Sequence, residues 1–251
     1  MNSDHIIPPW PAPDNVRVCI TTRAGGVSVA PYASNNFGLH VGDERSAVEA
    51  NREALCAQLD LKKAPQWLEQ IHGVKIVAAK GDHLVRTADG SYSTERGQAC
   101  VVMTADCLPV FLCDKKGTQV AVLHCGWRSL AKGICAIAVK QFNRSPEDLL
   151  VYLGPAISQK HFEVGVDVLE AFFKSARNAA HADAIAGAFI SAQRPLHFYA
   201  DIYELARAEL KSLGIKAIYG GDYCTYEQSE HFYSYRRDGV TGRMAHLIWL
   251  E

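Results

Sequence analysis

The chain has 251 residues, of which 48% are hydrophobic and 21% are charged, and its formal net charge is −1. This composition is typical of a globular protein with a substantial core, and the near-zero charge gives no electrostatic reason to expect binding to nucleic acid or to an anionic membrane. No apolar run approaches the ~20 residues that span a bilayer, and no secretory signal is visible. We therefore expect a cytoplasmic protein whose eight cysteines are free thiols.

The first half of the chain shows the hydrophobic patterns of several strands and one helix. The expected elements are a strand, a helix, a strand, a polar loop and three buried strands, at residues 16–22, 44–61, 74–77, 82–98, 99–103, 108–113 and 119–123. The last of these strands leads directly into His124.

The second half alternates helices and strands. We expect helices at residues 130–142, 166–180 and 202–214, and strands at residues 149–153, 217–219, 232–235 and 244–250. Asp201, with Glu204 three residues later, resembles a capping box at the start of the third helix, and Gly214 ends it. Because no linker, repeat or low-complexity tract divides the chain, we expect one α/β domain over residues 1–251.

Three potential metal ligands lie in polar patches beside apolar runs: His72, Cys107 and His124. Two imidazoles and one thiolate are a common ligand set for catalytic zinc, which keeps a fourth position for water or substrate. Cys107 interrupts an apolar strand run and His124 ends one, so we expect both side chains to project into a cleft. The spacing is too wide for a zinc finger or ribbon, and the sequence therefore predicts a catalytic metal site.

Asp106, beside Cys107, is a candidate to orient a histidine ligand or to act as an acid/base group, although it is also a suitable cap for a turn. Cys107 and His124 alone also fit a second chemistry, a thiolate–imidazolium pair that attacks a carbonyl, as in a cysteine hydrolase or amidase. The third donor, His72, favours the metal. A structural metal in a non-enzymatic binding module is the weaker alternative.

The motifs together resemble those of the YfiH family, also called the multicopper-polyphenol-oxidase-like or laccase-domain family. Besides the segments around the three donors, the matching segments are residues 21–28, 36–43, 152–157, 162–165, 234–238 and 241–243. The resemblance implies a single mixed α/β domain, an α+β sandwich with a CNF-toxin/YfiH-like fold of the cysteine-hydrolase type. Ser129 stands where the family more often has glycine, and serine is strained there only if its φ is positive.

The resemblance implies a cytoplasmic, zinc-dependent enzyme of purine nucleosides, with copper as the other possible metal. Its implied reaction is phosphorolysis of adenosine, inosine and methylthioadenosine to the free base and ribose 1-phosphate or methylthioribose 1-phosphate, together with adenosine deamination. Some members are linked instead to a Cys–His amidase that edits peptidoglycan precursors, and older naming implies a copper-dependent polyphenol oxidase. The chain contains no His-x-His pair, so the oxidase is the least favoured alternative. No nucleic acid, membrane or obligate protein partner is implied.

Each activity needs particular side chains near the metal. Deamination needs a metal-bound hydroxide and a carboxylate that moves a proton, which the three donors and Asp106 fit. Phosphorolysis needs a group that binds phosphate, and arginine suits it because its planar fork contacts two oxygens. The candidate substrate- and phosphate-binding residues are Arg23, Asn36, His40, Arg128 and Arg236. Each also has a structural alternative, as an ion-pair residue, a loop cap or a packed loop side chain.

Overall fold

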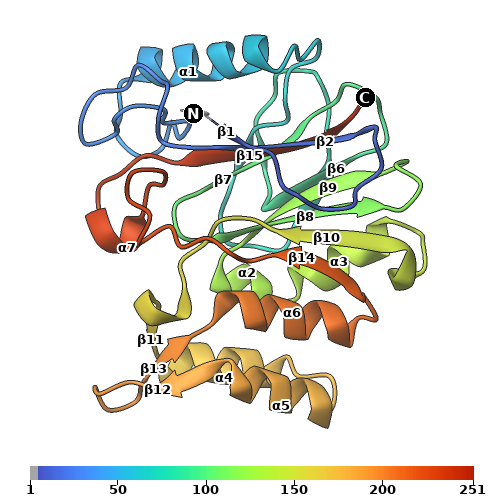
Figure 1. Cartoon of the computed structure of the whole chain (residues 1–251), viewed down its shortest axis with the longest axis vertical. Helices are drawn as coiled ribbons and strands as arrows, with labels where there is room; N and C mark the ends of the chain where they lie inside the picture. Colours follow the sequence, from blue (N-terminus) through green and yellow to red (C-terminus); the bar gives the residue numbers. More distant parts are fainter. Residues whose placement is uncertain (1–4) are drawn as a thin grey trace.

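The computed structural model describes residues 5–251 and contains two large β-sheets stacked face to face (Figure 1). The first sheet is antiparallel, with the order β1 (His5–Ile6), β2 (Val16–Thr21), β15 (Met244–Leu250) and β7 (Cys100–Thr104). Strands from near the two ends of the chain therefore pair at the centre of this sheet.

The second sheet has the order β14 (Ala217–Gly220), β10 (Leu149–Leu153), β8 (Leu108–Asp114), β9 (Val120–Cys125), β6 (Gly90–Ser93) and β4 (Ile76–Ala78). The β14–β10 and β6–β4 pairs are parallel, and the other neighbours are antiparallel. The strands β8, β9 and β10 are buried along their whole length. Burial on both faces explains why their sequences are nearly continuous apolar runs rather than alternating ones.

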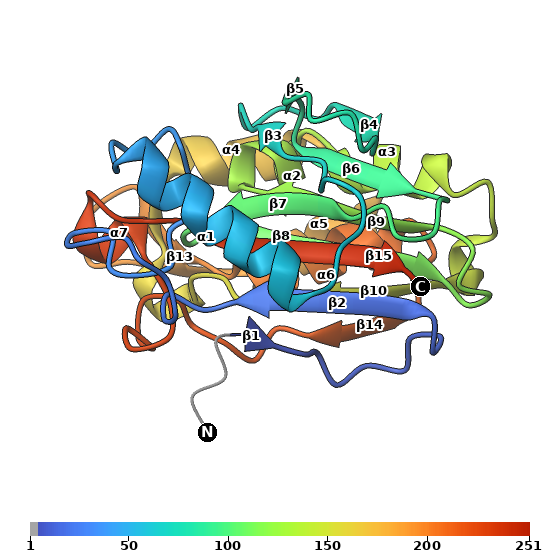
Figure 2. The same cartoon turned by 90° about the horizontal axis from the view of Figure 1, so that it is seen from above.

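Helices cover the outer faces of both sheets (Figures 1 and 2). The first sheet carries α1 (Arg45–Gln58), and the second carries α2 (Trp127–Ala131), α3 (Ile134–Gln141) and α6 (Ile202–Ser212). A further layer contains α4 (Val166–Lys174), α5 (Ala179–Gly187) and a small sheet of β11 (Glu163–Gly165), β13 (His197–Ala200) and β12 (Phe189–Ser191). The shorter elements are β3 (Leu68–Glu69), β5 (Arg86–Thr87), α7 (Tyr235–Asp238) and the 3₁₀ turns η1 (Pro146–Asp148) and η2 (Gln159–His161).

Three buried apolar clusters fill the spaces between these layers. The largest lies between the second sheet and its helices and includes Ile134. Another joins the two sheets and includes Val102 and Phe111, and the third joins α1 to the first sheet through Leu55 and Leu247. Because both faces of the central strands β8, β9 and β10 are covered, the polar side chains that remain inside the molecule need hydrogen-bonded partners.

Most of the predicted elements are confirmed, including the strand at residues 149–153 and the mixed α/β fold class. The side chain of Asp201 caps α6 by accepting hydrogen bonds from the backbone amides of Tyr203 and Glu204. Ser129 lies in α2 and is not among the positive-φ residues, so the serine is tolerated without strain.

Four elements differ from the prediction. The helix expected at 166–180 ends at Lys174, and a separate helix, α5, begins after Asn178, whose side chain accepts a hydrogen bond from the backbone amide of His181. The helix expected at 130–142 is divided into α2 and α3 at Gly133, whose φ of 82° only glycine adopts readily. The expected loop at 82–98 contains β5 and β6, whose polar strand residues carry no apolar pattern. The strand expected at 232–235 is absent, because the Ser234 side chain accepts a hydrogen bond from the backbone amide of Arg237 and begins α7 instead.

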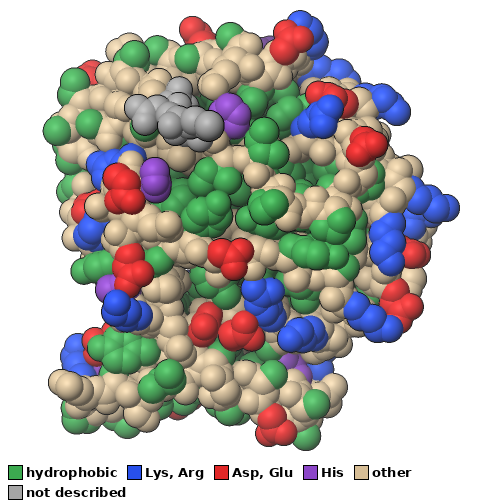
Figure 3. Space-filling model, in the orientation of Figure 1, with side chains coloured by type: hydrophobic (Ala, Val, Ile, Leu, Met, Phe, Trp, Pro, Cys, Tyr) green, Lys and Arg blue, Asp and Glu red, His purple; other side chains and the backbone are tan. Residues whose placement is uncertain are grey.

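The surface of the molecule agrees with the charge balance of the sequence. On the face shown in Figure 3, acidic and basic side chains are interspersed over the surface. Within the described residues, no helix is long and apolar enough to cross a membrane.

Candidate metal centre and substrate cleft

The three predicted ligands lie together although they come from three separate segments. His72 lies in the loop after β3, Cys107 directly precedes β8, and His124 is in β9. Their donor atoms all lie within 4.8 Å of one another, and Cys107 Sγ is 3.8 Å from His72 Nε2. Zinc bonds of about 2.3 Å to sulfur and 2.0–2.1 Å to nitrogen, at a tetrahedral angle, place such atoms roughly 3.6 Å apart. The donors therefore fit a single zinc ion.

Asp89, which directly precedes β6, connects two of these ligands and was not predicted. Its buried carboxylate accepts a hydrogen bond from His124 Nδ1 at 2.9 Å and from the backbone amides of His72 and Gly73 at 2.9 and 2.6 Å. Because Nδ1 of His124 is hydrogen-bonded to Asp89, its Nε2 atom is the one available to a metal shared with His72 and Cys107. Burial opposes ionisation of Asp89, but the hydrogen bonds from His124 and Gly73 outweigh it and lower the pKa of this carboxyl.

The backbone around the ligands is unusual in two places. His72 has a φ of 57° and Asp106 a φ of 90°, and such angles cost energy in residues with a Cβ. Gly126, the N-cap of α2, packs against the ligands, since a Cβ there would lie 2.8 Å from His72 Cδ2 and 3.2 Å from Cys107 Sγ. The ligand positions are thus set by backbone conformations that the surrounding hydrogen bonds maintain.

The surroundings of Cys107 favour ionisation of its thiol. Burial alone would raise its pKa, but the charge of His124 and hydrogen bonds from His124 and His72 outweigh burial and lower the pKa to about 6. Burial likewise opposes the charge on His124, whereas Cys107 and the bonded Asp89 raise its pKa to about 9. Without a metal, the pair is therefore a thiolate beside an imidazolium, and zinc binding would displace the proton of His124.

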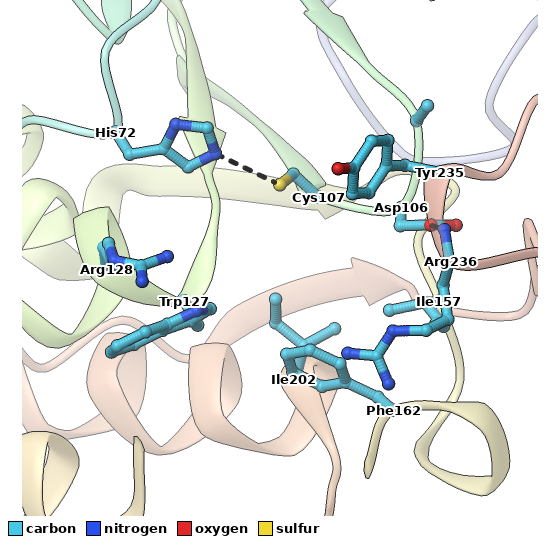
Figure 4. A pocket seen from close by; sticks show the side chains of 11 residues that line it. His72, Asp106, Cys107, Trp127, Arg128, Ile157, Phe162, Ile202, Tyr235 and Arg236 are labelled. Atoms are coloured by element: carbon cyan, nitrogen blue, oxygen red, sulfur yellow. Dashed lines mark hydrogen bonds between the residues drawn. The ribbon is translucent and has the colours of Figure 1, made fainter. Parts of the chain in front are cut away.

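Two adjoining cavities meet at the ligand cluster and share His72, Ala105, Cys107 and Tyr235. The first has an apolar wall, with two arginines at its edge (Figure 4), and is lined further by Trp127, Arg128, Ile157, Phe162, Ile202 and Arg236. The second is more polar and is lined further by His40, Gln70, Met103, Thr104, His124 and Arg243. The candidate metal centre therefore lies between an apolar and a polar half of one cleft.

Comparison with known proteins identifies the family of the chain. Residues 17–251 match the family model described as multi-copper polyphenol oxidoreductase laccase. The chain belongs to this family. It is 49% identical over 246 residues to purine nucleoside phosphorylase YfiH of Escherichia coli and 48% identical over 246 residues to purine nucleoside phosphorylase PA4543 of Pseudomonas aeruginosa, with 98% of each chain covered in both cases.

Solved structures of the family have the same fold. The crystal structure of Neisseria meningitidis protein NMB0706 is 45% identical, with a TM-score of 0.93 over 99% of this chain and 100% of that chain. The structure of YlmD from Geobacillus stearothermophilus is 28% identical, with a TM-score of 0.90 over 100% of this chain and 97% of that chain. The family resemblance that the motifs predicted is confirmed.

Within this family fold, Asp106 does not contact a histidine ligand. One carboxylate oxygen accepts a hydrogen bond from Thr225 Oγ1 at 2.7 Å, and the other accepts from the backbone amide of Arg236 at 2.6 Å. Asp106 thereby holds the segment before β15 beside the first cavity. The carboxylate that orients His124 is that of Asp89 instead.

The predicted substrate-binding residues fall into two groups. Arg128 stacks on Trp127, with 4.2 Å between the guanidinium carbon and the ring centre, and Arg236 lies over Phe162 at 5.5 Å; both line the first cavity. His40 lines the second cavity. Arg23 and Asn36 line neither: Arg23 donates to the carbonyl oxygens of Ala33 and Ser229, and Asn36 is fully buried, with its side chain hydrogen-bonded to Asp43 and to the backbone amide of Arg243. The structure therefore leaves three of the five beside the metal ligands.

A second group of potential ligands, His161, Cys224 and Glu227, lies on the outer side of the segment that carries Arg236. The carboxylate of Glu227 is already paired, with Lys160 and His161 each at 2.9 Å. This group is therefore an ion-paired cluster, in which Cys224 is buried and Glu227 is exposed.

Proposed function

We propose that the protein is a zinc-dependent purine nucleoside phosphorylase whose reaction takes place at His72, Cys107 and His124. The observation that carries this proposal is the position of these donors where two cavities meet, one with an apolar wall edged by Arg128 and Arg236 and the other more polar and lined by Arg243. The names of the relatives in E. coli and P. aeruginosa support the same activity. The expected substrates are adenosine, inosine and methylthioadenosine.

The first cavity suits the nucleoside. Trp127, Phe162 and Ile202 offer apolar and aromatic surface for a purine ring, which gains stacking and hydrophobic free energy there. Arg128 and Arg236 add hydrogen-bond donors at the edge of the same wall, where ring nitrogens, exocyclic oxygens or ribose hydroxyls need them. Zinc, when bound, would supply positive charge and Lewis acidity at the end of this wall.

Adenosine deamination is the second activity we propose for the site. Asp106 lines the first cavity and is the carboxylate that would move the proton. Both of its oxygens already accept hydrogen bonds, from Thr225 and from the backbone of Arg236, so proton transfer would weaken contacts that shape the cavity. We therefore place deamination below phosphorolysis.

A metal-free amidase is the alternative that the ionisation of Cys107 favours. A thiol whose pKa is about 6 is a nucleophile at neutral pH, and an adjacent imidazolium assists it. In that mechanism, removal of the metal would leave activity on a peptide or muropeptide amide intact, whereas in ours it abolishes turnover. Copper in place of zinc would be detected by elemental analysis of the purified protein.

All eight cysteines are unpaired, which supports the proposed cytoplasmic location because structural disulfides are the rule in oxidising compartments.

The test is chromatographic. Metal-replete protein is incubated with adenosine, with and without phosphate, beside Cys107→Ala and a control variant, Cys56→Ala, whose cysteine lies on the distant helix α1. Adenine and ribose 1-phosphate formed only with phosphate, lost in Cys107→Ala and retained in Cys56→Ala, would support phosphorolysis. Inosine formed without phosphate would instead favour deamination. No turnover of adenosine or inosine in any condition would contradict both purine reactions.

A further inference from the structure

Arg243 forms no ion pair with a carboxylate of the described residues, and the negative groups that act on it at longer range are Cys107 and Asp106. It lies directly before β15 and lines the second cavity. Its Nη1 atom donates to the carbonyl oxygens of Thr241 and Gly242 at 3.0 and 2.9 Å. Among residues 5–251, no carboxylate is within ion-pair distance of this guanidinium, and its Nε and Nη2 atoms have no protein acceptor. A half-buried cation with free donors in a cleft is typical of a site for an anionic ligand.

Two basic side chains, His40 and Arg52, lie near Arg243. His40 lines the same cavity, and burial together with the charges of Arg243 and Arg52 lowers the pKa of its imidazole. Arg52 lies in the adjoining hollow, stacked on Trp67 at 3.8 Å, and its guanidinium donates to the carbonyl oxygen of Phe37 rather than to a carboxylate. No aspartate or glutamate lines the second cavity. The Cys107 thiolate and the His124 imidazolium of this cavity offset each other, so Arg243 supplies the positive charge that would attract an anion.

Other polar side chains of the second cavity are already engaged. Gln70 exchanges two hydrogen bonds with the backbone of Met103, at 2.7 and 2.8 Å. Thr104 Oγ1 is 2.8 Å from His246 Nε2. Apart from the candidate metal ligands, the side chains of this cavity with a free donor are thus Arg243, His40 and Tyr235.

The position of Arg243 is set by a residue first considered for substrate binding. Asn36 Oδ1 accepts a hydrogen bond from the backbone amide of Arg243 at 2.8 Å, and the backbone amide of Phe37 donates to the Arg243 carbonyl oxygen at 3.1 Å. Asn36 is fully buried, so these contacts hold the arginine at one position relative to the ligand cluster. Asn36 is thus a positioning residue for Arg243.

We propose that the second cavity is the phosphate subsite of the enzyme, where Arg243 binds inorganic phosphate through its free guanidinium edge and His40 adds a second donor. The phosphorolysis step described next rests on the proposed function, whereas the binding of phosphate at Arg243 does not depend on it. An oxygen of hydrogen phosphate forms a bond to C1′ of the ribose while the C1′–N9 bond breaks and its electron pair leaves with the base. The proton of hydrogen phosphate balances the one that the base gains.

The arrangement of the two cavities fits this displacement. The attacking oxygen and the leaving base must occupy opposite sides of C1′, and the two cavities adjoin only along the edge that includes His72, Cys107 and Tyr235. A base against Trp127 and a phosphate at Arg243 would place C1′ at that edge. Arg128 and Arg236 then belong to the nucleoside side of the cleft.

The experiment compares two arginines, one from each cavity. Arg243→Gln removes the guanidinium group with free donors from the second cavity, and Arg128→Gln removes a guanidinium group from the first. We expect Arg243→Gln to raise the KM for phosphate about tenfold or more, the usual effect of losing a charge-assisted hydrogen bond, with the KM for adenosine changed less than about twofold. Arg128→Gln should show the opposite pattern. Arg243→Lys, which keeps the charge without the fork, should fall between wild type and Arg243→Gln.

Phosphate binding is measured separately by equilibrium dialysis of labelled inorganic phosphate against metal-replete protein without nucleoside. Weaker binding in Arg243→Gln, but not in Arg128→Gln, would support the subsite even if no nucleoside is cleaved. Unchanged phosphate binding and unchanged phosphate KM in a folded Arg243→Gln would overturn the subsite and leave the phosphorylase intact. If Arg243→Gln fails to fold, His40→Gln and Arg243→Lys provide the same test. An unchanged KM for phosphate in both of these variants would also overturn the phosphate subsite.

Discussion

The buried histidine of β15 gives a quantitative prediction about acid stability. His246 is fully buried, with Nε2 at 2.8 Å from Thr104 Oγ1 and its ring edge-on to Phe111. Burial, assisted by the charge of His124, lowers the pKa of its imidazole from 6.5 to about 3. The folded protein therefore keeps His246 neutral at pH values where the unfolded chain protonates it.

The sign and size of the effect follow from proton linkage. Since the folded pKa is depressed, the stabilisation is present above the unfolded pKa of 6.5 and is lost as pH falls from there toward 3. At pH 5 the unfolded imidazole is almost fully protonated and the native one almost not at all, so the free energy of unfolding has decreased by about 2 kcal/mol relative to pH 8. This value at pH 5 hardly depends on the folded pKa, provided that it stays below about 4.

The assay is urea denaturation at pH 8, 7, 6 and 5 of wild type and His246→Gln, with chelator present so that metal release does not contribute. Glutamine retains a hydrogen-bonding group near Thr104 but does not titrate. We expect the variant to be less stable at pH 8, because packing is lost, and to lose about 2 kcal/mol less than wild type between pH 8 and pH 5. An equal loss in the two proteins would refute the reasoning. His231→Gln, which removes an exposed histidine, should follow the wild-type curve.

Three further substitutions test the candidate site. Asp89→Asn replaces the acceptor of His124 Nδ1 and should weaken zinc binding about 10- to 100-fold in a chelator competition, and unchanged affinity would contradict its orienting role. Gly126→Ala places a methyl group against His72 and Cys107 and should also weaken zinc binding, whereas Gly187→Ala, which meets nothing within 4 Å, should not. Asp106→Asn should raise the nucleoside KM while zinc content stays at the wild-type level, because the hydrogen bonds of Asp106 hold the wall of the first cavity. Loss of zinc in Asp106→Asn would show that its role was misassigned.

Local patterns in the sequence predicted much of the fold. The apolar run at 149–153 predicted β10, and the cap at Asp201 predicted the start of α6. Both predictions succeeded because strand burial and helix capping leave patterns in residues that are neighbours in the sequence. The failures occurred where tertiary contacts override local preference. β6 is a polar strand that pairs with β9 in the middle of a sheet, and α7 begins at a serine that caps it beside the cleft.

The chemistry available at the site was predictable from the sequence: two imidazoles and a thiol at the edges of apolar strands, in a chain with the motifs of one family. Most of the strands and helices that carry those residues were also predictable. Only the tertiary structure showed that Asp89 supports His72 and His124, that Arg23 lies outside the cleft, and that Arg243 lies within it without an acid partner. Hydrogen bonds and ion pairs between residues distant in sequence depend on chain topology, and local sequence patterns do not record which carboxylate meets which cation.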